Sequence, residues 1–247
     1  MGDEVVQTPF GKFLVDPRDL IGSTLKAGTC WDGPGFLQVI AREHGRLGEP
    51  GVTILDVGAN QGAFTIWLAS CGAWRVVAVE PVPQTMQRLK ANLDLNREVT
   101  AQVVIPLEVA DYSGRQDLWM PTVDPGNTGG TALHPLQAWQ LLGEVEGVDS
   151  VIRTCALDDY AWLWRKGLAL IKIDAQGCDG RILRGLQQTL KKYRPAVVFE
   201  WEAELATGHG DTLEVTLDWL HQQGYEVKEW PSQPNNFLAL PREAQCA

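Results

Sequence analysis

The stretch ILDVGANQGAFTIWLA, residues Ile54–Ala69, joins two apolar runs that have different periodicities. The first run is short and continuous, which indicates a buried strand that ends at Asp56, and the second has the spacing of a helix. Between them, Gly58 and Gly62 remove Cβ atoms from the turn, where the backbone of an open parallel sheet comes closest to a ligand. The stretch therefore predicts a strand, a ligand-binding turn and a helix whose free N–H groups face the ligand.

The rest of the chain continues this alternation of strand and helix patterns. Strands are predicted at residues 74–81, 101–110, 168–174 and 195–202, and helices at residues 83–96, 180–193 and 212–224. Such alternation is typical of an α/β fold in which right-handed helical crossovers join parallel strands. The last apolar runs, residues 225–230 and 235–240, lie too close together for a crossover helix, so we expect them to pair antiparallel. The predicted fold is a doubly wound, mostly parallel sheet with an antiparallel C-terminal strand.

Length and composition favour one globular unit. The 247 residues, of which 45% are hydrophobic, suffice for one sizeable core. Residues 1–50 are dense in Gly, Pro and Asp and show a helix pattern only at residues 36–48. We interpret them as a cap on the substrate side that leads into a single domain over residues 51–247. The sequence leaves open whether the chain forms a homodimer.

Charge and cysteine content exclude several classes of function. The net charge of −10 opposes binding to a phosphate backbone, so we expect no nucleic acid partner. The five cysteines are odd in number and lack Cys-x-x-Cys pairs, which indicates reduced thiols, and no metal-binding signature is present. With neither a signal-peptide pattern nor an apolar run of membrane-spanning length, we expect a cytoplasmic protein that does not associate with a membrane.

Two acidic residues and an asparagine define the expected cofactor. Asp56 precedes the turn, and Glu80 ends the next strand about 20 residues further on, where a carboxylate can accept both hydroxyls of a ribose. A dinucleotide fingerprint requires a glycine at the position of Asn60 so that pyrophosphate can approach the backbone. S-adenosylmethionine has no phosphate, and its methionine end needs mixed donors and acceptors. The turn therefore favours a methyl donor over NAD, and a nicotinamide-dependent oxidoreductase is the alternative.

A third cofactor contact is predicted after the third strand, in the segment EVADYSG. Asp111 is placed to accept a hydrogen bond from an adenine amino group, with Ala110 and Tyr112 beside the ring. The alternative is that Asp111 is only a turn residue before Gly114.

Candidate catalytic residues follow the later strands and one long loop. Methyl transfer to oxygen needs alignment of the nucleophile, and a base that removes the hydroxyl proton helps. Asp174 ends the fourth strand and is the best-placed carboxylate, although a helix-capping role is the alternative. Glu200 ends the fifth strand, and His134 and His209 lie in predicted loops, where a histidine is often only a surface residue. Lys172, in a buried strand, requires a carboxylate partner.

Several segments in order resemble the motifs of FkbM-type S-adenosylmethionine-dependent methyltransferases: ILDVGANQGAFTIWLA, VVAVEPVPQTMQRLKANLDLN, LALIKIDAQGCDGRILRGL, AVVFEWE and NNFLAL. The resemblance implies a class I methyltransferase fold, a cofactor site that includes Glu80 and Pro81, and usually O-methylation of a hydroxyl on a small molecule such as a natural product or sugar. The family pattern usually reads Lys-Ile-Asp-x-Glu-Gly, whereas here Gln176 replaces the glutamate. Gln176 keeps the shape but loses the charge, which raises the alternative of a cofactor-binding module without catalysis.

Overall fold

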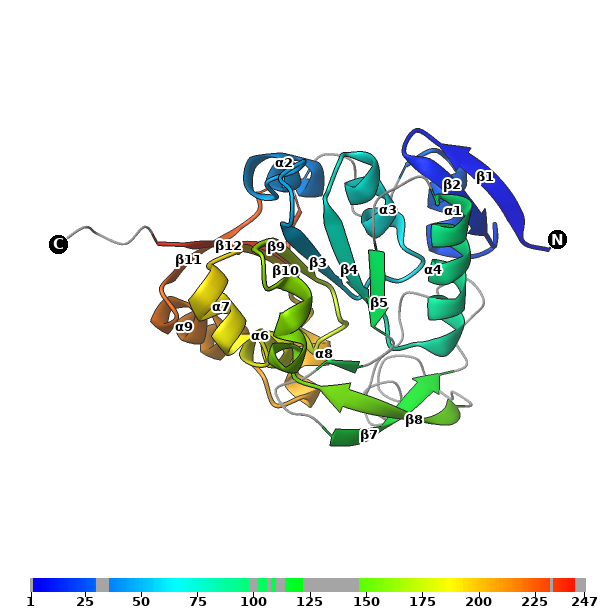
Figure 1. Cartoon of the computed structure of the whole chain (residues 1–247). Coiled ribbons are helices and arrows are strands. Elements are labelled where there is room, and N and C mark those ends of the chain that lie inside the picture. Colours follow the sequence, from blue (N-terminus) through cyan, green and yellow to red (C-terminus); the bar gives the residue numbers. More distant parts are fainter. Residues whose placement is uncertain are drawn as a thin grey trace.

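The computed structural model describes residues 2–29, 36–97, 102–105, 108–109, 114–121, 147–231 and 233–242. Its centre is a seven-stranded sheet of order β11-β12-β10-β9-β3-β4-β5 (Figure 1). The strands are β3 (Thr53–Val57), β4 (Arg75–Val79), β5 (Gln102–Ile105), β9 (Leu168–Ile173), β10 (Ala196–Glu200), β11 (Tyr225–Glu229) and β12 (Asn236–Pro241). Neighbours from β10 to β5 are parallel, while β12 runs antiparallel to both β10 and β11. The predicted α/β fold with an antiparallel C-terminal strand is confirmed.

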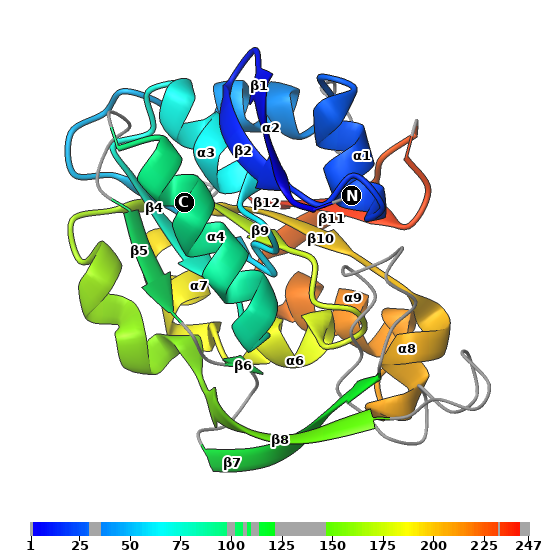
Figure 2. The same ribbon diagram turned by 90° about the vertical axis from the view of Figure 1, so that its right-hand side faces the viewer.

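Helices cover both faces of this sheet, because alternate residues of each buried strand point to opposite sides. On one face, Ile54, Val76 and Leu170 pack against α2 (Phe36–His44) and α3 (Ala63–Ser70). On the other, Leu55 and Ile171 pack among buried residues of the 3-10 helix η1, α6, α7 and α9. Figure 2 shows α2 and α3 above the sheet and α6, α7 and α9 below it. The helices of the second layer are η1 (Leu157–Trp164), α6 (Asp179–Arg184), α7 (Gln187–Tyr193), α8 (Ala203–Gly208) and α9 (Leu213–Gln222).

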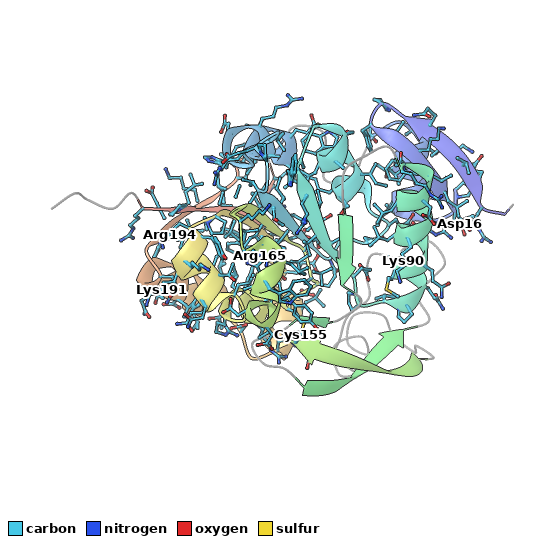
Figure 3. The ribbon with its side chains drawn as sticks, in the orientation of Figure 1. Asp16, Lys90, Cys155, Arg165, Lys191 and Arg194 are labelled. Atoms are coloured by element: carbon cyan, nitrogen blue, oxygen red, sulfur yellow. The ribbon has the colours of Figure 1, made fainter. Side chains whose placement is uncertain are left out.

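The N-terminal residues are more regular than the sequence pattern predicts. A hairpin of β1 (Glu4–Thr8) and β2 (Gly11–Val15) is followed by helix α1 (Leu20–Lys26) before α2. The hairpin lies along α4 (Pro83–Leu95), and Figure 3 places Asp16 beside that helix. The expectation of a single helix in residues 1–50 is therefore wrong.

Two asparagine side chains attach this hairpin to the domain. Asn96, just after α4, accepts a hydrogen bond from the Lys12 N–H at 2.9 Å and donates one to the Lys12 carbonyl at 2.8 Å. Asn92 accepts from the Leu14 N–H at 2.7 Å. An amide that satisfies both backbone groups of one residue takes the place of a neighbouring strand, so the free edge of β2 has partners without a third strand.

Two local expectations from the sequence are corrected. The helix predicted at residues 180–193 is split into α6 and α7, because Asp158 accepts hydrogen bonds from the Gln188 and Thr189 N–H groups and caps a new helix there. The strand predicted at residues 101–110 is divided between β5 and β6 (Glu108–Val109). β6 belongs to a second, three-stranded sheet with β7 (Gly114–Pro121) and β8 (Gly147–Cys155), which lies below the carboxyl ends of β3 and β4 in Figure 1.

Loss of the Asn96 amide should destabilise the protein. Asn96→Ala removes both hydrogen bonds to the Lys12 backbone, and we expect the free energy of unfolding to fall by about 1–3 kcal/mol. Urea unfolding measures this change. The control is Asp94→Ala on the same helix, whose side chain is 69% exposed and which should change the value by less than about 0.5 kcal/mol. Equal stability of the two variants would show that the hairpin does not depend on this contact.

Candidate functional site

The turn after β3 is folded tightly against the ends of two other strands. Gly58 has a φ of +74°, and a Cβ atom there would lie 1.8 Å from the carbonyl oxygen of Asp174. Only glycine fits this approach. Gly62 has a φ of +87°, and a Cβ there would lie 2.5 Å from Leu89 of α4. One glycine thus brings the turn onto the end of β9, and the other lets α4 pack over the start of α3.

Glu80 stands at the end of β4 and supports the same turn. Its carboxylate accepts hydrogen bonds from the Asn60 and Val82 N–H groups, both at 2.9 Å. Burial raises the pKa of Glu80 to about 7, although both N–H groups favour the charged form. A carboxylate oxygen has a further lone pair beside each of these bonds, so the geometry allows ligand hydroxyls to bind. Pro81 follows directly and is partly exposed.

A buried ion cluster joins β3 to β9. Lys172 pairs in register with Asp56, and its ammonium lies 3.8 Å from the Asp56 carboxylate and 3.1 Å from that of Asp174. It also donates to the Gly58 carbonyl at 3.5 Å. Asp56 is completely buried and accepts a hydrogen bond from the Thr65 hydroxyl of α3 at 2.5 Å. The sequence-based requirement that Lys172 has a carboxylate partner is met twice.

The two carboxylates of this cluster respond to burial differently. Burial raises the pKa of Asp56, and the Lys172 charge offsets this only in part. Burial also opposes the ionisation of Asp174, but Lys172 together with hydrogen bonds from Glu200 and Gln176 outweighs it, so the pKa of Asp174 lies below its ordinary value. The Asp174 side chain keeps 22% exposure. Asp174 is therefore the ionised, accessible member of the cluster.

Glu200 and Gln176 surround Asp174 from two sides. Gln176 adopts a left-handed conformation with a φ of +49°, and its amide donates to the second oxygen of Asp174 at 3.2 Å. Glu200 ends β10, which is separated from β3 by β9. Of the two strands that end at Asp174 and Glu200, only β9 therefore lies directly beside β3. Asp174 does not cap a helix through any contact that the structure describes, and the start of α6, at Cys178, has no side-chain cap.

Asp179 is a buried carboxyl group that the sequence analysis did not single out. It is 1% exposed and accepts from the N–H groups of Ala175 at 3.4 Å and Gly177 at 3.2 Å. Burial, followed by repulsion from Asp174, raises the pKa of Asp179 to about 7. Its only sequence signal is an acidic residue at the start of a helix pattern, which indicates a cap rather than a perturbed group.

His209 lies at the C-terminal end of α8, after β10. Its Nε2 atom is 3.5 Å from the sulfur of the buried Cys178. The loop that follows is held by Arg184, which contacts both carboxylate oxygens of Asp211 at 3.0 and 2.7 Å. The remaining predicted site residues, Ala110, Asp111, Tyr112 and His134, lie outside the described residues, so their roles stay predictions.

The described part of the chain contains neither a metal-binding cluster nor a membrane-spanning helix. Within those residues, no cluster of three or more His, Cys, Asp or Glu side chains has a metal-binding arrangement. No helix there combines the length and the apolar character needed to cross a membrane.

Comparisons with known proteins agree with this geometry. The family model described as "Methyltransferase FkbM domain" matches residues 56–227, so the chain belongs to the FkbM methyltransferase family. The AMB antimetabolite synthetase AmbE of Pseudomonas aeruginosa is 29% identical over 228 residues, an alignment that covers 78% of this chain and 10% of that protein.

One solved structure supports the fold. The methyltransferase FkbM of Methylobacillus flagellatus superposes with a TM-score of 0.51 at 16% identity, covering 79% of this chain and 45% of that one. A precorrin-6y C5,15-methyltransferase of Geobacter metallireducens gives a TM-score of 0.42 at 14% identity and covers 83% and 85% of the two chains. The chain thus spans a tenth of the curated relative and less than half of the solved FkbM protein. The fold is that of class I methyltransferases.

The raised pKa values predict how stability depends on pH. The folded protein keeps protons on Glu80 and Asp179 up to about pH 7, whereas the unfolded chain releases them near 4.5 and 3.8. The stabilisation is complete below these unfolded values and is lost as pH rises through about 7, by about 3 kcal/mol for Glu80 and about 4 kcal/mol for Asp179. Urea unfolding of the ligand-free protein should show Glu80→Gln losing less stability than wild type between pH 5 and 8.

The control for this comparison is Glu226→Gln. Its side chain is 60% exposed and its pKa is lowered by Lys228, so it stays ionised across the whole range. It should therefore parallel wild type. A Glu80→Gln curve that also runs parallel would refute the raised pKa of Glu80.

Proposed function

We propose that this methyltransferase uses S-adenosylmethionine and transfers its methyl group to a hydroxyl of a small molecule, such as a natural product or sugar. The observation that carries the proposal is the meeting of the Gly58 turn, held by Glu80, with the ionised Asp174 at the carboxyl ends of β3, β4 and β9. Ligands of doubly wound sheets bind at this edge, where the strand order reverses. Family membership favours a methyl donor over the nicotinamide alternative.

On the donor side, the two buried carboxylates have different tasks. Glu80 accepts the ribose hydroxyls, and the turn from Gly58 to Asn60 faces the methionine end of the cofactor. Asp56 is 0% exposed, so it acts on the turn through Lys172, which contacts the Gly58 carbonyl. In this proposal Ala110, Asp111 and Tyr112 surround the adenine.

On the acceptor side, Asp174 orients the hydroxyl and takes its proton. The oxygen–carbon bond forms as the carbon–sulfur bond of the sulfonium breaks, the proton moves to the Asp174 carboxylate, and S-adenosylhomocysteine leaves. Lys172 keeps Asp174 ionised, and Glu200 forms a hydrogen bond with Asp174. The Asp174 carboxylate is therefore charged before the acceptor arrives. His134 and His209 are the alternative bases. The name of the AmbE relative, an antimetabolite synthetase, agrees with a small-molecule acceptor.

Cofactor titration and product analysis test the proposal in sequence. Isothermal titration with S-adenosylmethionine and with NAD should give binding only for the first. Incubation with a panel of hydroxylated natural products and sugars, followed by mass spectrometry, should give a product heavier by one methylene unit. NAD binding without S-adenosylmethionine binding would refute the donor. Tight donor binding with no methylated product would favour a non-catalytic module.

Asp174→Asn tests the base. The substitution keeps the shape of the side chain and removes the charge that accepts the proton, so we expect kcat to fall by about 10² to 10⁴ with the affinity for S-adenosylmethionine nearly kept. Asp218→Asn, on the exposed side of α9, is the matched control and should keep wild-type turnover. If Asp174→Asn also keeps wild-type turnover, the base is another residue, and His209 and His134 are the next variants in the same assay.

Glu80→Ala tests the ribose contact. Losing two charge-assisted hydrogen bonds should weaken binding of S-adenosylmethionine by roughly 2 to 4 kcal/mol, measured by isothermal titration. Because the hydroxyls bind the ionised form of Glu80, wild-type affinity should rise as pH increases through about 7. The variant should lack this rise. An unchanged dissociation constant would show that the second strand does not end at the ribose.

A further inference from the structure

The N-terminal segment reaches the cofactor turn through one buried contact. The amide of Gln61, in the turn, donates to the carboxylate of Asp19 at 2.6 Å. Asp19 is 1% exposed and Gln61 is 2% exposed. The same Asp19 oxygen accepts from the Gly22 N–H at 3.1 Å and so caps α1. One carboxylate therefore fixes both the start of α1 and the side of the turn.

Gln61 is held by its backbone as well as by its side chain. Its N–H donates to the side-chain oxygen of Asn60 at 2.7 Å, and its carbonyl accepts from the Asn92 amide of α4 at 2.8 Å. Asn60 itself has a φ of +50° and donates its N–H to Glu80. The chain of contacts thus runs from Asp19 through Gln61 to the residue that Glu80 holds.

The conformation of Asn60 makes this support necessary. A left-handed backbone is uncommon for a non-glycine residue and persists only where its surroundings impose it. If the turn is free to adopt other conformations, ligand binding has to select the competent one, and the apparent dissociation constant rises by the inverse of its population. Contacts that fix Gln61 therefore raise the affinity for a ligand of the turn without touching that ligand.

We propose that Asp19 and Gln61 are positioning residues, through which the N-terminal segment keeps the turn in the conformation that binds the methyl donor. The inference rests on the proposed use of S-adenosylmethionine. It gives residues 1–50 a role that differs from the expected one. A cap on the substrate side would affect binding of the methyl acceptor, whereas the contact between Asp19 and Gln61 affects binding of the methyl donor.

An exchange of the two groups tests the contact. Gln61→Glu puts two carboxylates at 2.6 Å spacing, and we expect the dissociation constant for S-adenosylmethionine to rise at least about tenfold. Adding Asp19→Asn restores a donor and an acceptor, because the new amide donates to Glu while its oxygen still caps α1. The dissociation constant of the double variant should return to within about threefold of the wild-type value. Two independent losses that simply add would not restore it.

A second variant avoids the like-charge pair. Asp19→Ser keeps a capping oxygen for the Gly22 N–H but is too short to reach Gln61, so donor affinity should fall while α1 stays capped. Lys26→Gln breaks only the exposed contact of Lys26 with Glu4 in the same segment and is the control. Isothermal titration is done below the unfolding transition of each variant, and the KM for the donor should rise without a matching fall in kcat.

The outcomes separate this inference from the proposed function. Wild-type protein that does not bind S-adenosylmethionine overturns both. Wild-type binding, with Gln61→Glu and Asp19→Ser binding as tightly, overturns the positioning role alone. A double variant no better than Gln61→Glu has the same meaning, because the exchanged pair then fails to replace the contact.

Discussion

The buried ammonium group of Lys172 is the constraint around which the site is built. A charge on a face of the sheet that is otherwise apolar costs several kcal/mol unless opposite charges accompany it. Asp56 supplies one because it is the register partner of Lys172 on β3, and Asp174 supplies the other from two residues further along the same chain. This pairing works only if β9 lies directly beside β3. The chain leaves β3 toward β4 and β5 and returns on the opposite side at β9, so the charge pair coincides with the point where strand order reverses.

The same cluster separates the protonation states of the carboxyl groups around it. Glu80 and Asp179 have pKa values raised to about 7 by burial, whereas the cation beside Asp174 keeps that group ionised. Carboxyl groups pushed in opposite directions within one site are typical of acid–base chemistry. Gln176 fits this pattern, because another carboxylate at its position would repel Asp174, while its amide donates a hydrogen bond. The lost charge at this position therefore supports the ionised state of Asp174 and is compatible with catalysis.

The sequence predicted the parts of the fold whose causes are local. The strand, turn and helix around Gly58, the strand that ends at Glu80 and the need of Lys172 for a partner all follow from spacing within about ten residues. The hairpin β1–β2 could not be predicted in this way. The backbone groups at its edge are hydrogen-bonded by Asn92 and Asn96, which lie 78 and 84 residues away in sequence. The break between α6 and α7 likewise depends on Asp158, 30 residues before the N–H that it caps. Long-range polar contacts have no periodicity, so patterns of apolar residues do not reveal them.

The turn after β3 is consequently fixed from two directions by groups that share no residue. On one side, Asp19 and Asn92 hold Gln61. On the other, Lys172 holds the carbonyl of Gly58, whose α-carbon has no room for a side chain against the backbone of Asp174. A displacement of the turn therefore moves the residue that we propose as the base, and a displacement of β9 moves the turn. In-line methyl transfer depends on the alignment of donor, acceptor and base to within a fraction of an ångström. A rigid connection between Gly58 and Asp174 provides that alignment before either substrate binds. This need for alignment explains why buried contacts from four separate elements hold so short a turn.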